Sequence, residues 1–161
     1  MRRRAHCKKW LFPAFFRFNF VFADDSPEKK ELTERLFQRI EDEGMEIYIS
    51  EIVVDEINKA PEPKKGQLLK LIEKYNPMLL SVAQEVKDMA QKLIEERVIP
   101  ERYIDDALHI SVAVVNNLDI LISWNFQHIV KVKTRVEVNA ISKLLRYNGI
   151  EICSPEEMIE L

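Results

Sequence analysis

The segment from Tyr103 to Ser123 constrains the fold of this chain more than any other part of the sequence. Its first part, 104–117, is apolar on nearly every side of a helix, and its last part, 119–123, is a short apolar run typical of a buried strand. A helix that is apolar all round is buried, and a strand without polar alternation is covered on both faces. This segment therefore predicts a parallel sheet with helices packed against both of its sides.

Helices and strands alternate along the rest of the sequence as well. Ser26 is a favourable N-cap, Pro27 suits the first helical position, and Gly44 ends the same helix. Further predicted helices cover residues 51–59, 64–75, 83–97, 136–147 and 154–161, and predicted strands cover residues 16–22, 45–50, 78–82 and 150–153. This order predicts one α/β domain over residues 1–161, a three-layer α/β/α sandwich around a mostly parallel sheet of about four to five strands.

The overall composition is that of a globular protein with a full hydrophobic core. The chain has 161 residues, of which 47% are hydrophobic and 32% are charged, so it is not disordered and is too short for two comfortable domains. Its net charge of −3 gives no general attraction to nucleic acid, so such binding needs a local basic patch. Two cysteines form no disulfide framework, which favours a cytoplasmic location.

No part of the sequence is expected to lie in a membrane. No apolar run approaches the roughly 20 residues that a membrane span needs. The N-terminus has a basic start and then an aromatic run, but Arg17 interrupts that run and no small-residue cleavage site follows, which weakens its interpretation as a signal peptide.

Polar residues follow two of the predicted strands at the edge where parallel sheets bind ligands. Glu56 comes shortly after the strand at 45–50, and Ser123 and Asn125 follow the strand at 119–123. The helix that leads into the latter strand begins with Asp106, and His109 lies one turn further on. We expect these five side chains to gather at one edge of the sheet.

Each of these residues also has a purely structural explanation. A carboxylate in a first helical turn, such as Asp106 or its neighbour Asp105, is stabilised by the helix dipole by about 0.3–1 kcal/mol. His109 fits a packed core position, Asn125 fits turn chemistry after a strand, and Glu56 fits a solvated helix face. The hypothesis of a site therefore depends on their combination.

The stretch DDALHISVAVVNNLDILISWNFQHIV, residues 105–130, resembles the C-terminal half of a PIN domain, the nuclease fold of VapC-type toxins. That family has an Asp-Ala-Leu helix, a strand, and then Ser or Thr-x-Asp or Asn. SEIVVDEI, residues 50–57, resembles the other acidic segment of the family, and the likeness extends from about residue 20 to the end. The resemblance implies a metal-dependent endoribonuclease, the toxin of a toxin–antitoxin pair. It also implies RNA as substrate, an antitoxin protein as partner and a homodimer.

The resemblance also implies roles for the candidate residues. Glu56 and Asp106 would be ligands of Mg²⁺ or Mn²⁺, which are hard ions that bind carboxylate oxygens. Asn125 stands where many members have a further Asp, and Ser123 would orient its neighbours. His109 would support the metal site or contact RNA.

Local positive charge for an RNA backbone is available on both sides of this motif. Arg102 precedes it, and Lys131, Lys133 and Arg135 follow it. These residues could hold phosphates at the rim of the site. A solvated loop explains the three residues after the motif equally well.

The sequence departs from the family at the first catalytic Asp. That Asp is expected near Ala14, but there is no carboxylate between Met1 and Val21, and six of the eight phenylalanines lie between Phe12 and Phe22. Two explanations are open. The protein is a catalytically inactive PIN module that binds RNA or a protein partner, or residues 1–17 are disordered or encoded in a shifted reading frame.

A phosphoacceptor receiver domain is a competing interpretation from another class. The stretch from Val21 to Lys30 predicts a strand followed by an acidic pair, as in that fold. A receiver domain also needs an Asp after its third strand and a Lys after its fifth. The strand at 78–82 is followed by no suitable Asp, and Cys153 is followed by Ser-Pro, so we disfavour this interpretation.

Overall fold

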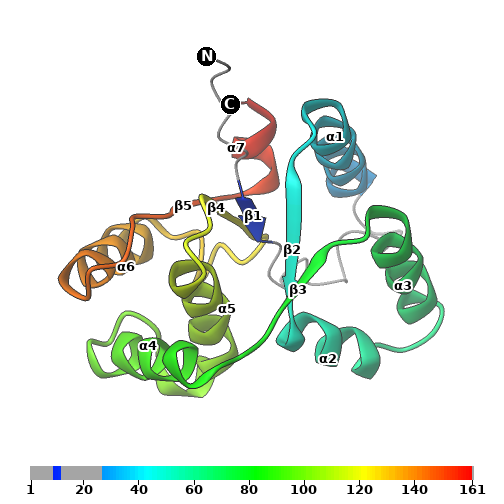
Figure 1. Cartoon of the computed structure of the whole chain (residues 1–161). Coiled ribbons are helices and arrows are strands. Elements are labelled where there is room, and N and C mark those ends of the chain that lie inside the picture. Colours follow the sequence, from blue (N-terminus) through cyan, green and yellow to red (C-terminus); the bar gives the residue numbers. More distant parts are fainter. Residues whose placement is uncertain (1–8, 12–26, 161) are drawn as a thin grey trace, which may run out of the picture.

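The computed structural model describes residues 9–11 and 27–160 of the chain. Helices and strands alternate through this part (Figure 1), and they are β1 (Lys9–Leu11), α1 (Pro27–Glu43), β2 (Glu46–Ser50), α2 (Glu51–Lys59), α3 (Lys64–Tyr75), β3 (Met78–Leu80), α4 (Gln84–Glu95), the 3₁₀ turn η1 (Glu101–Tyr103), α5 (Ile104–Val115), β4 (Ile120–Ile122), α6 (Val132–Leu144), β5 (Glu151–Cys153) and α7 (Pro155–Glu160). The predicted α/β class is confirmed.

The strands form a parallel sheet in the order β3-β2-β1-β4-β5. The pairings are short: β1 meets β4 over two residue pairs, and each of the other pairings covers three. Along the chain, β2 pairs beside β1 and β3 beside β2; β4 then pairs on the other side of β1, and β5 beside β4. In an open sheet with this order, ligands bind at the carboxyl ends of the strands, where the order reverses.

Two hydrophobic clusters lie on opposite faces of the sheet. Along β4, Leu121 belongs to one cluster, whereas Ile120 and Ile122 belong to the other. Along β5, Ile152 and Cys153 divide in the same way. Because successive strand residues point to opposite faces, both faces need a helical cover. Helices α4, α5 and α6 cover one face, and α1, α2, α3 and α7 cover the other, which makes three layers (Figure 1).

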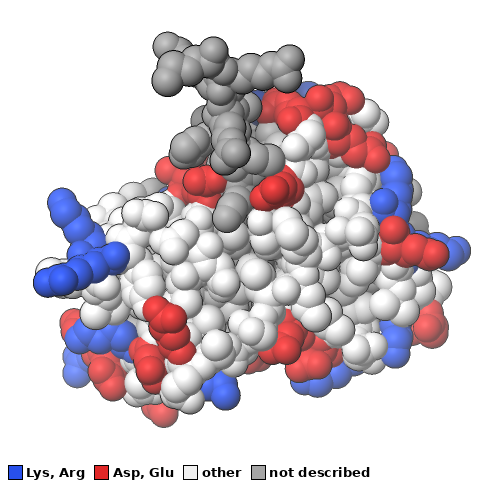
Figure 2. Space-filling model, in the orientation of Figure 1, with Lys and Arg blue, Asp and Glu red and all other residues white. Residues whose placement is uncertain are grey.

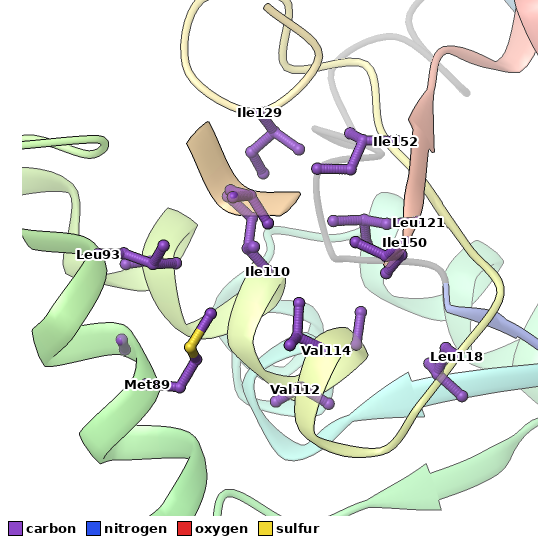
Figure 3. Packing of buried hydrophobic residues seen from close by; sticks show 14 of the residues in the cluster. Met89, Leu93, Ile110, Val112, Val114, Leu118, Leu121, Ile129, Ile150 and Ile152 are labelled. Atoms are coloured by element: carbon purple, nitrogen blue, oxygen red, sulfur yellow. The ribbon is translucent and has the colours of Figure 1, made fainter. Parts of the chain in front are cut away.

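Helix α5 is the most deeply buried helix of the first layer. Eight of its residues are buried, on several sides of the helix, which confirms the prediction from its sequence. Ile110 packs in the same cluster as Met89 and Leu93 of α4 and Leu121 of β4 (Figure 3). Full burial of one such side chain contributes about 1.5–3 kcal/mol. The position of the first turn of α5 is therefore held by the core.

The structure corrects the start of one predicted helix, whereas one predicted strand stays a prediction. The predicted strand at 16–22 lies outside the described residues, and the strand β1 that the structure describes begins at Lys9, inside the atypical N-terminal segment. Helix α6 begins at Val132 and not at 136, so Lys133 and Arg135 are helical. No side chain caps the N-terminus of this helix, so the sequence carried no start signal there.

Side-chain bonds to carbonyls of the preceding turn hold the first turn of α6 instead. The Thr134 hydroxyl donates to the carbonyl of His128 over 2.7 Å, and Arg135 Nε donates to the carbonyl of Val130 over 2.8 Å. Within residues 9–11 and 27–160, no helix is long and apolar enough to cross a membrane.

Candidate functional site

Asp106 and Asn125 meet at the carboxyl edge of the sheet. Helix α5 directly precedes β4 and runs antiparallel to it. Its first turn, which carries Asp106, therefore lies beside the residues that follow β4. Asn125 Nδ2 donates to Asp106 Oδ2 over 3.1 Å, and the two residues are 7% and 3% exposed. The neighbouring Asp105 is exposed, in keeping with a role at the helix end. The structure therefore brings together Asp106 and Asn125, two of the candidate residues of the motif.

The turn after β4 fixes the orientation of the Asn125 amide. The Asn125 backbone N–H donates to Ser123 Oγ over 3.0 Å, and Asn125 Oδ1 accepts from the His128 N–H over 3.0 Å. The Asn125 carbonyl accepts from the N–H groups of Ile129 and Val130. With its oxygen occupied by the turn, the amide presents its N–H₂ group to Asp106. Turn chemistry and site chemistry thus coexist in this residue.

Glu56 reaches the same helix from the other side of the candidate site. Ser50 ends β2 and caps α2, since its Oγ accepts from the Val53 N–H over 3.4 Å. Glu56 Oε1 then lies 3.5 Å from His109 Nε2, with the Glu56 side chain 28% exposed. Since Asp106 and His109 are three residues apart on α5, they are neighbours on one helix surface. Glu56 therefore faces the part of α5 that carries Asp106.

The burial of His109 corrects one sequence-based expectation. The side chain of His109 is fully buried, so its ring is out of reach of an RNA chain in this structure. Because its ring contacts the Glu56 carboxylate, His109 helps to position Glu56. The apolar residues around it in the sequence were the signal for a core position, and they outweighed the polar character of the ring.

A tilted pair of aromatic rings beside the site was not predicted from the sequence. The rings of Tyr103 and His128 have centroids 3.9 Å apart, and the Arg102 guanidinium carbon lies 4.7 Å from the Tyr103 centroid. Tyr103 stands directly before α5, and His128 lies in the turn after β4. In the sequence, this ring pair is indicated only by a tyrosine three residues before Asp106, because His128 lies 25 residues further along the chain.

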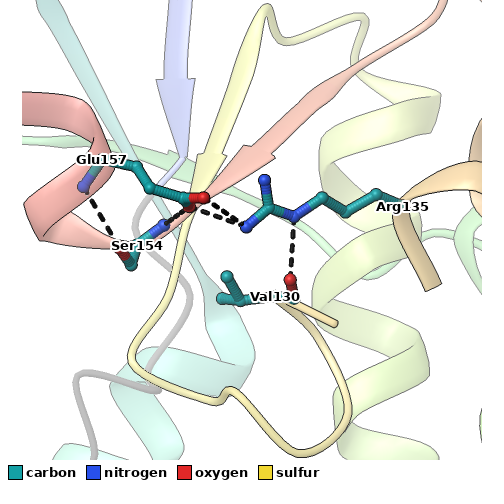
Figure 4. A network of polar contacts seen from close by, with 4 residues as sticks. All are labelled: Val130, Arg135, Ser154 and Glu157. Atoms are coloured by element: carbon teal, nitrogen blue, oxygen red, sulfur yellow. Dashed lines mark hydrogen bonds and ion pairs between the residues drawn. The ribbon is translucent and has the colours of Figure 1, made fainter. Parts of the chain in front are cut away.

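The basic residues near the motif have different roles in the structure. Arg135 is engaged in a structural network, because its guanidinium donates two bonds of 2.9 and 2.7 Å to the Glu157 carboxylate and a third to Val130 (Figure 4). Lys133 lies 3.7 Å from Glu137 and is largely exposed, and Lys131 is exposed beside it. Arg102, Lys131 and Lys133 therefore remain the candidates for contact with phosphate.

The network around Arg135 also closes the last helix. Ser154 Oγ accepts from the Glu157 N–H over 3.2 Å, and the Glu157 carboxylate accepts from the Ser154 N–H over 2.8 Å, which is a capping box (Figure 4). Burial opposes the ionisation of Glu157, but hydrogen bonds from Arg135 and Ser154 outweigh it and lower the pKa of this carboxyl. The carboxyl end of β5 is thus tied to α6 and α7.

The described side chains at this edge do not form a complete set of ligands for a divalent cation. Among the described residues, no group of three His, Cys, Asp or Glu side chains is placed to hold a metal ion. The Asp106 carboxylate accepts from Asn125, and Glu56 faces His109. In the sequence, β1 is followed by Phe12, Pro13 and Ala14, which carry no carboxylate.

Comparison with known proteins supports the fold that the motif predicts. No protein-family model matches the chain, and no curated protein matches it. It is similar to a chain in the crystal structure of VapBC2 from Rickettsia felis bound to a DNA fragment from their promoter. The two share 13% sequence identity with a TM-score of 0.52, over 91% of this chain and 98% of the other. This likeness supports a PIN-like fold.

Proposed function

We propose that this chain is a PIN-fold protein of the VapC toxin kind with an impaired metal-dependent endoribonuclease centre. The observation that carries the proposal is the buried Asp106–Asn125 pair at the carboxyl edge of the sheet, with Glu56 facing the same helix. This is the arrangement that the PIN motif implies, and it is one carboxylate short. The likeness to a chain of a toxin–antitoxin complex supports the same class.

Charge explains why the loss of one carboxylate matters. A divalent ion that activates water and neutralises a phosphodiester needs several anionic oxygens around it. Two carboxylates supply too little charge, and each has a protein partner in this structure, Asn125 for Asp106 and His109 for Glu56. The site is therefore stable without a metal ion and poorly suited to recruit one.

The partners follow from the same proposal. An antitoxin protein and single-stranded RNA are the expected ligands, and a homodimer in the cytoplasm is the expected state. Arg102 lies over the ring of Tyr103 directly before α5, and Lys131 and Lys133 are exposed at the start of α6; these three residues would contact the RNA backbone. Ser123 and Asn125 would orient Asp106, and neither would touch the phosphate directly.

A non-catalytic module that binds RNA or a protein is the second candidate function. The specific observation in its favour is that Asn125, a neutral donor, replaces a possible further carboxylate and bonds to Asp106. Such a site keeps the shape of a nuclease edge without its charge.

One set of variants separates the two candidates. Single-stranded RNA is incubated with the chain, with Ala14→Asp and Pro13→Asp variants, and with Ala14→Asp combined with Asp106→Asn, each in Mn²⁺ or EDTA. We expect little cleavage by the unaltered chain, Mn²⁺-dependent cleavage by one added carboxylate, and its loss with Asp106→Asn. Efficient RNA cleavage by the unaltered chain would contradict the proposal that its nuclease centre is impaired. Absence of cleavage by every correctly folded variant would favour the non-catalytic binding module.

A further inference from the structure

Helix α6 carries a row of exposed apolar side chains. Val132, Val136 and Leu144 are 73%, 64% and 80% exposed, and Ala140 between them is exposed as well. Single exposed apolar residues are ordinary on a protein surface. These four recur at intervals of four residues, so they form one continuous ridge along the helix. We call them the α6 ridge.

The opposite side of α6 is already used by the core. Val138 and Ile141 are buried in the cluster that also holds Ile150 and Ile152 of the β5 region. Helix α6 lies at the outside of its layer, away from the middle of the sheet (Figure 1). The ridge therefore contributes nothing to the packing of the described fold, and its side chains are available to another molecule.

Basic side chains border the ridge. Lys131, Lys133, Lys143 and Arg146 are exposed, and the only acidic residue between Val132 and Leu144 is Glu137. A group of Lys and Arg side chains projects from the surface at the left, where α6 lies (Figure 2). Because the chain as a whole has a net charge of −3, this helix is a local basic exception.

The distribution of charge argues against a second copy as the occupant. In an antiparallel α6 pair, Lys131 and Lys133 of one copy would approach Lys143 and Arg146 of the other. In a parallel pair, equal charges would lie side by side. Both arrangements bring like charges together around an apolar contact, which disfavours association. The ridge and its border instead fit a partner that is apolar in the centre and acidic at the rim.

We propose that α6 is a docking surface for an acidic amphipathic helix of a partner protein. The apolar side of that helix packs against the α6 ridge, with its own four-residue rows in the grooves beside Val136 and Ala140. Its acidic residues meet Lys133 and Lys143. No residue of the ridge belongs to the carboxyl-edge site, so this inference goes beyond the proposed nuclease function. Lys133 is shared with the proposed RNA contacts, and the test therefore measures peptide binding and no cleavage.

The test uses two stapled helical peptides as long as α6 and binding to the full chain by fluorescence anisotropy. Both peptides carry leucines at four-residue intervals, and their rim positions are all Glu in one and all Lys in the other. We expect the acidic peptide to bind and the basic peptide to bind at least about tenfold more weakly. Val136→Glu should weaken the binding of the acidic peptide about tenfold or more. Leu69→Glu, which replaces an exposed apolar residue on α3, should leave the affinity for the acidic peptide unchanged.

A charge swap distinguishes docking from general attraction. The double variant Lys133→Glu with Lys143→Glu should reverse the preference between the two peptides. Equal binding of both peptides, or binding insensitive to Val136→Glu, would overturn the proposal. Binding of anionic phospholipid vesicles or of oligouridine that is lost in Val136→Glu while the acidic peptide fails to bind would overturn it too, as would a dimer that Val136→Glu dissociates.

Discussion

Asn125 donates from its side-chain amide to Asp106 over 3.1 Å, and both side chains are more than nine-tenths buried. The pairing joins the first turn of α5 to the turn after β4, which are separated by a complete helix and strand. The amide supplies a proton that an aspartate in its place would not supply. This contact is therefore both the centre of the candidate site and a tertiary link between two elements.

Replacement of this donor by a carboxylate should destabilise the fold. In Asn125→Asp, the oxygen that accepts from the His128 N–H is kept, but two carboxylates then face each other in a buried place. We expect the free energy of unfolding to fall by about 1–3 kcal/mol, measured by urea denaturation at neutral pH. Asn148→Asp, at an exposed position, is the matched control. Recovery of stability by Mn²⁺ in the Asn125→Asp variant would show that the added carboxylate completes a metal site, and unchanged stability without metal would contradict the prediction.

The burial of α5 predicts an unequal response to truncation. Ile110→Ala removes a fully buried side chain from the core between α4 and β4 and should lower the free energy of unfolding by about 2–5 kcal/mol. Val136→Ala, on the exposed ridge of α6, should change it by less than about 0.5 kcal/mol. Thermal and urea unfolding of both variants would check this contrast, and similar losses in the two would argue against the packing described.

The Glu157 carboxyl should make the fold sensitive to acid. Its pKa is lowered in the folded state from the ordinary value of 4.5 because the bonds from Arg135 and Ser154 outweigh burial. The stability from this group is therefore fully present above pH 4.5 and is lost as the pH falls through the lower folded pKa. In Glu157→Gln, the decline of unfolding free energy with acid should be shallower. An unchanged acid dependence would contradict the role of the carboxylate.

Contact of Lys131 and Lys133 with RNA would show in the salt dependence of binding. The double variant Lys131→Ala with Lys133→Ala should weaken binding of single-stranded RNA, and the slope of log affinity against log salt should decrease by about one to two. Lys64→Ala with Lys65→Ala on α3 is a control with the same change of charge. Unchanged affinity and slope in the first pair would remove these residues from the RNA-binding surface.

The shifted-frame explanation for the N-terminus can be checked at the level of the gene. Translation of the other two frames upstream of codon 18 should reveal an apolar strand that ends in Asp-Thr or Asp-Ser. A protein rebuilt with that segment should cleave RNA in Mn²⁺ and lose this activity with Asp106→Asn. If neither frame encodes such a strand, the shifted-frame explanation fails, and the interpretation as an inactive relative is favoured.

The alternation of helices and strands, and the burial of α5, could be predicted from the sequence because both depend on local periodicity. An apolar stretch such as 104–115 buries itself wherever the chain places it, so its environment follows from composition alone. Helices α2 and α3 begin and end at the predicted residues. Ser50 caps the start of α2, Pro61 and Pro63 separate the two helices, and Asn76 in the left-handed conformation ends α3. These features need no knowledge of distant parts of the chain.

Other features depended on specific side-chain contacts that periodicity and capping residues do not predict. The start of α6 is set by bonds from Thr134 and Arg135 to carbonyls of the preceding turn, and no local cap announces it. The sequence brought Asp106 and Asn125 forward as candidates through the motif, but the bond between them exists because α5 and β4 pack side by side. The contact of Glu56 with His109 likewise depends on α2 meeting α5. Local chemistry thus determined which elements form and which residues are candidates, whereas the packing of the layers decided which side chains meet and how their charges are balanced.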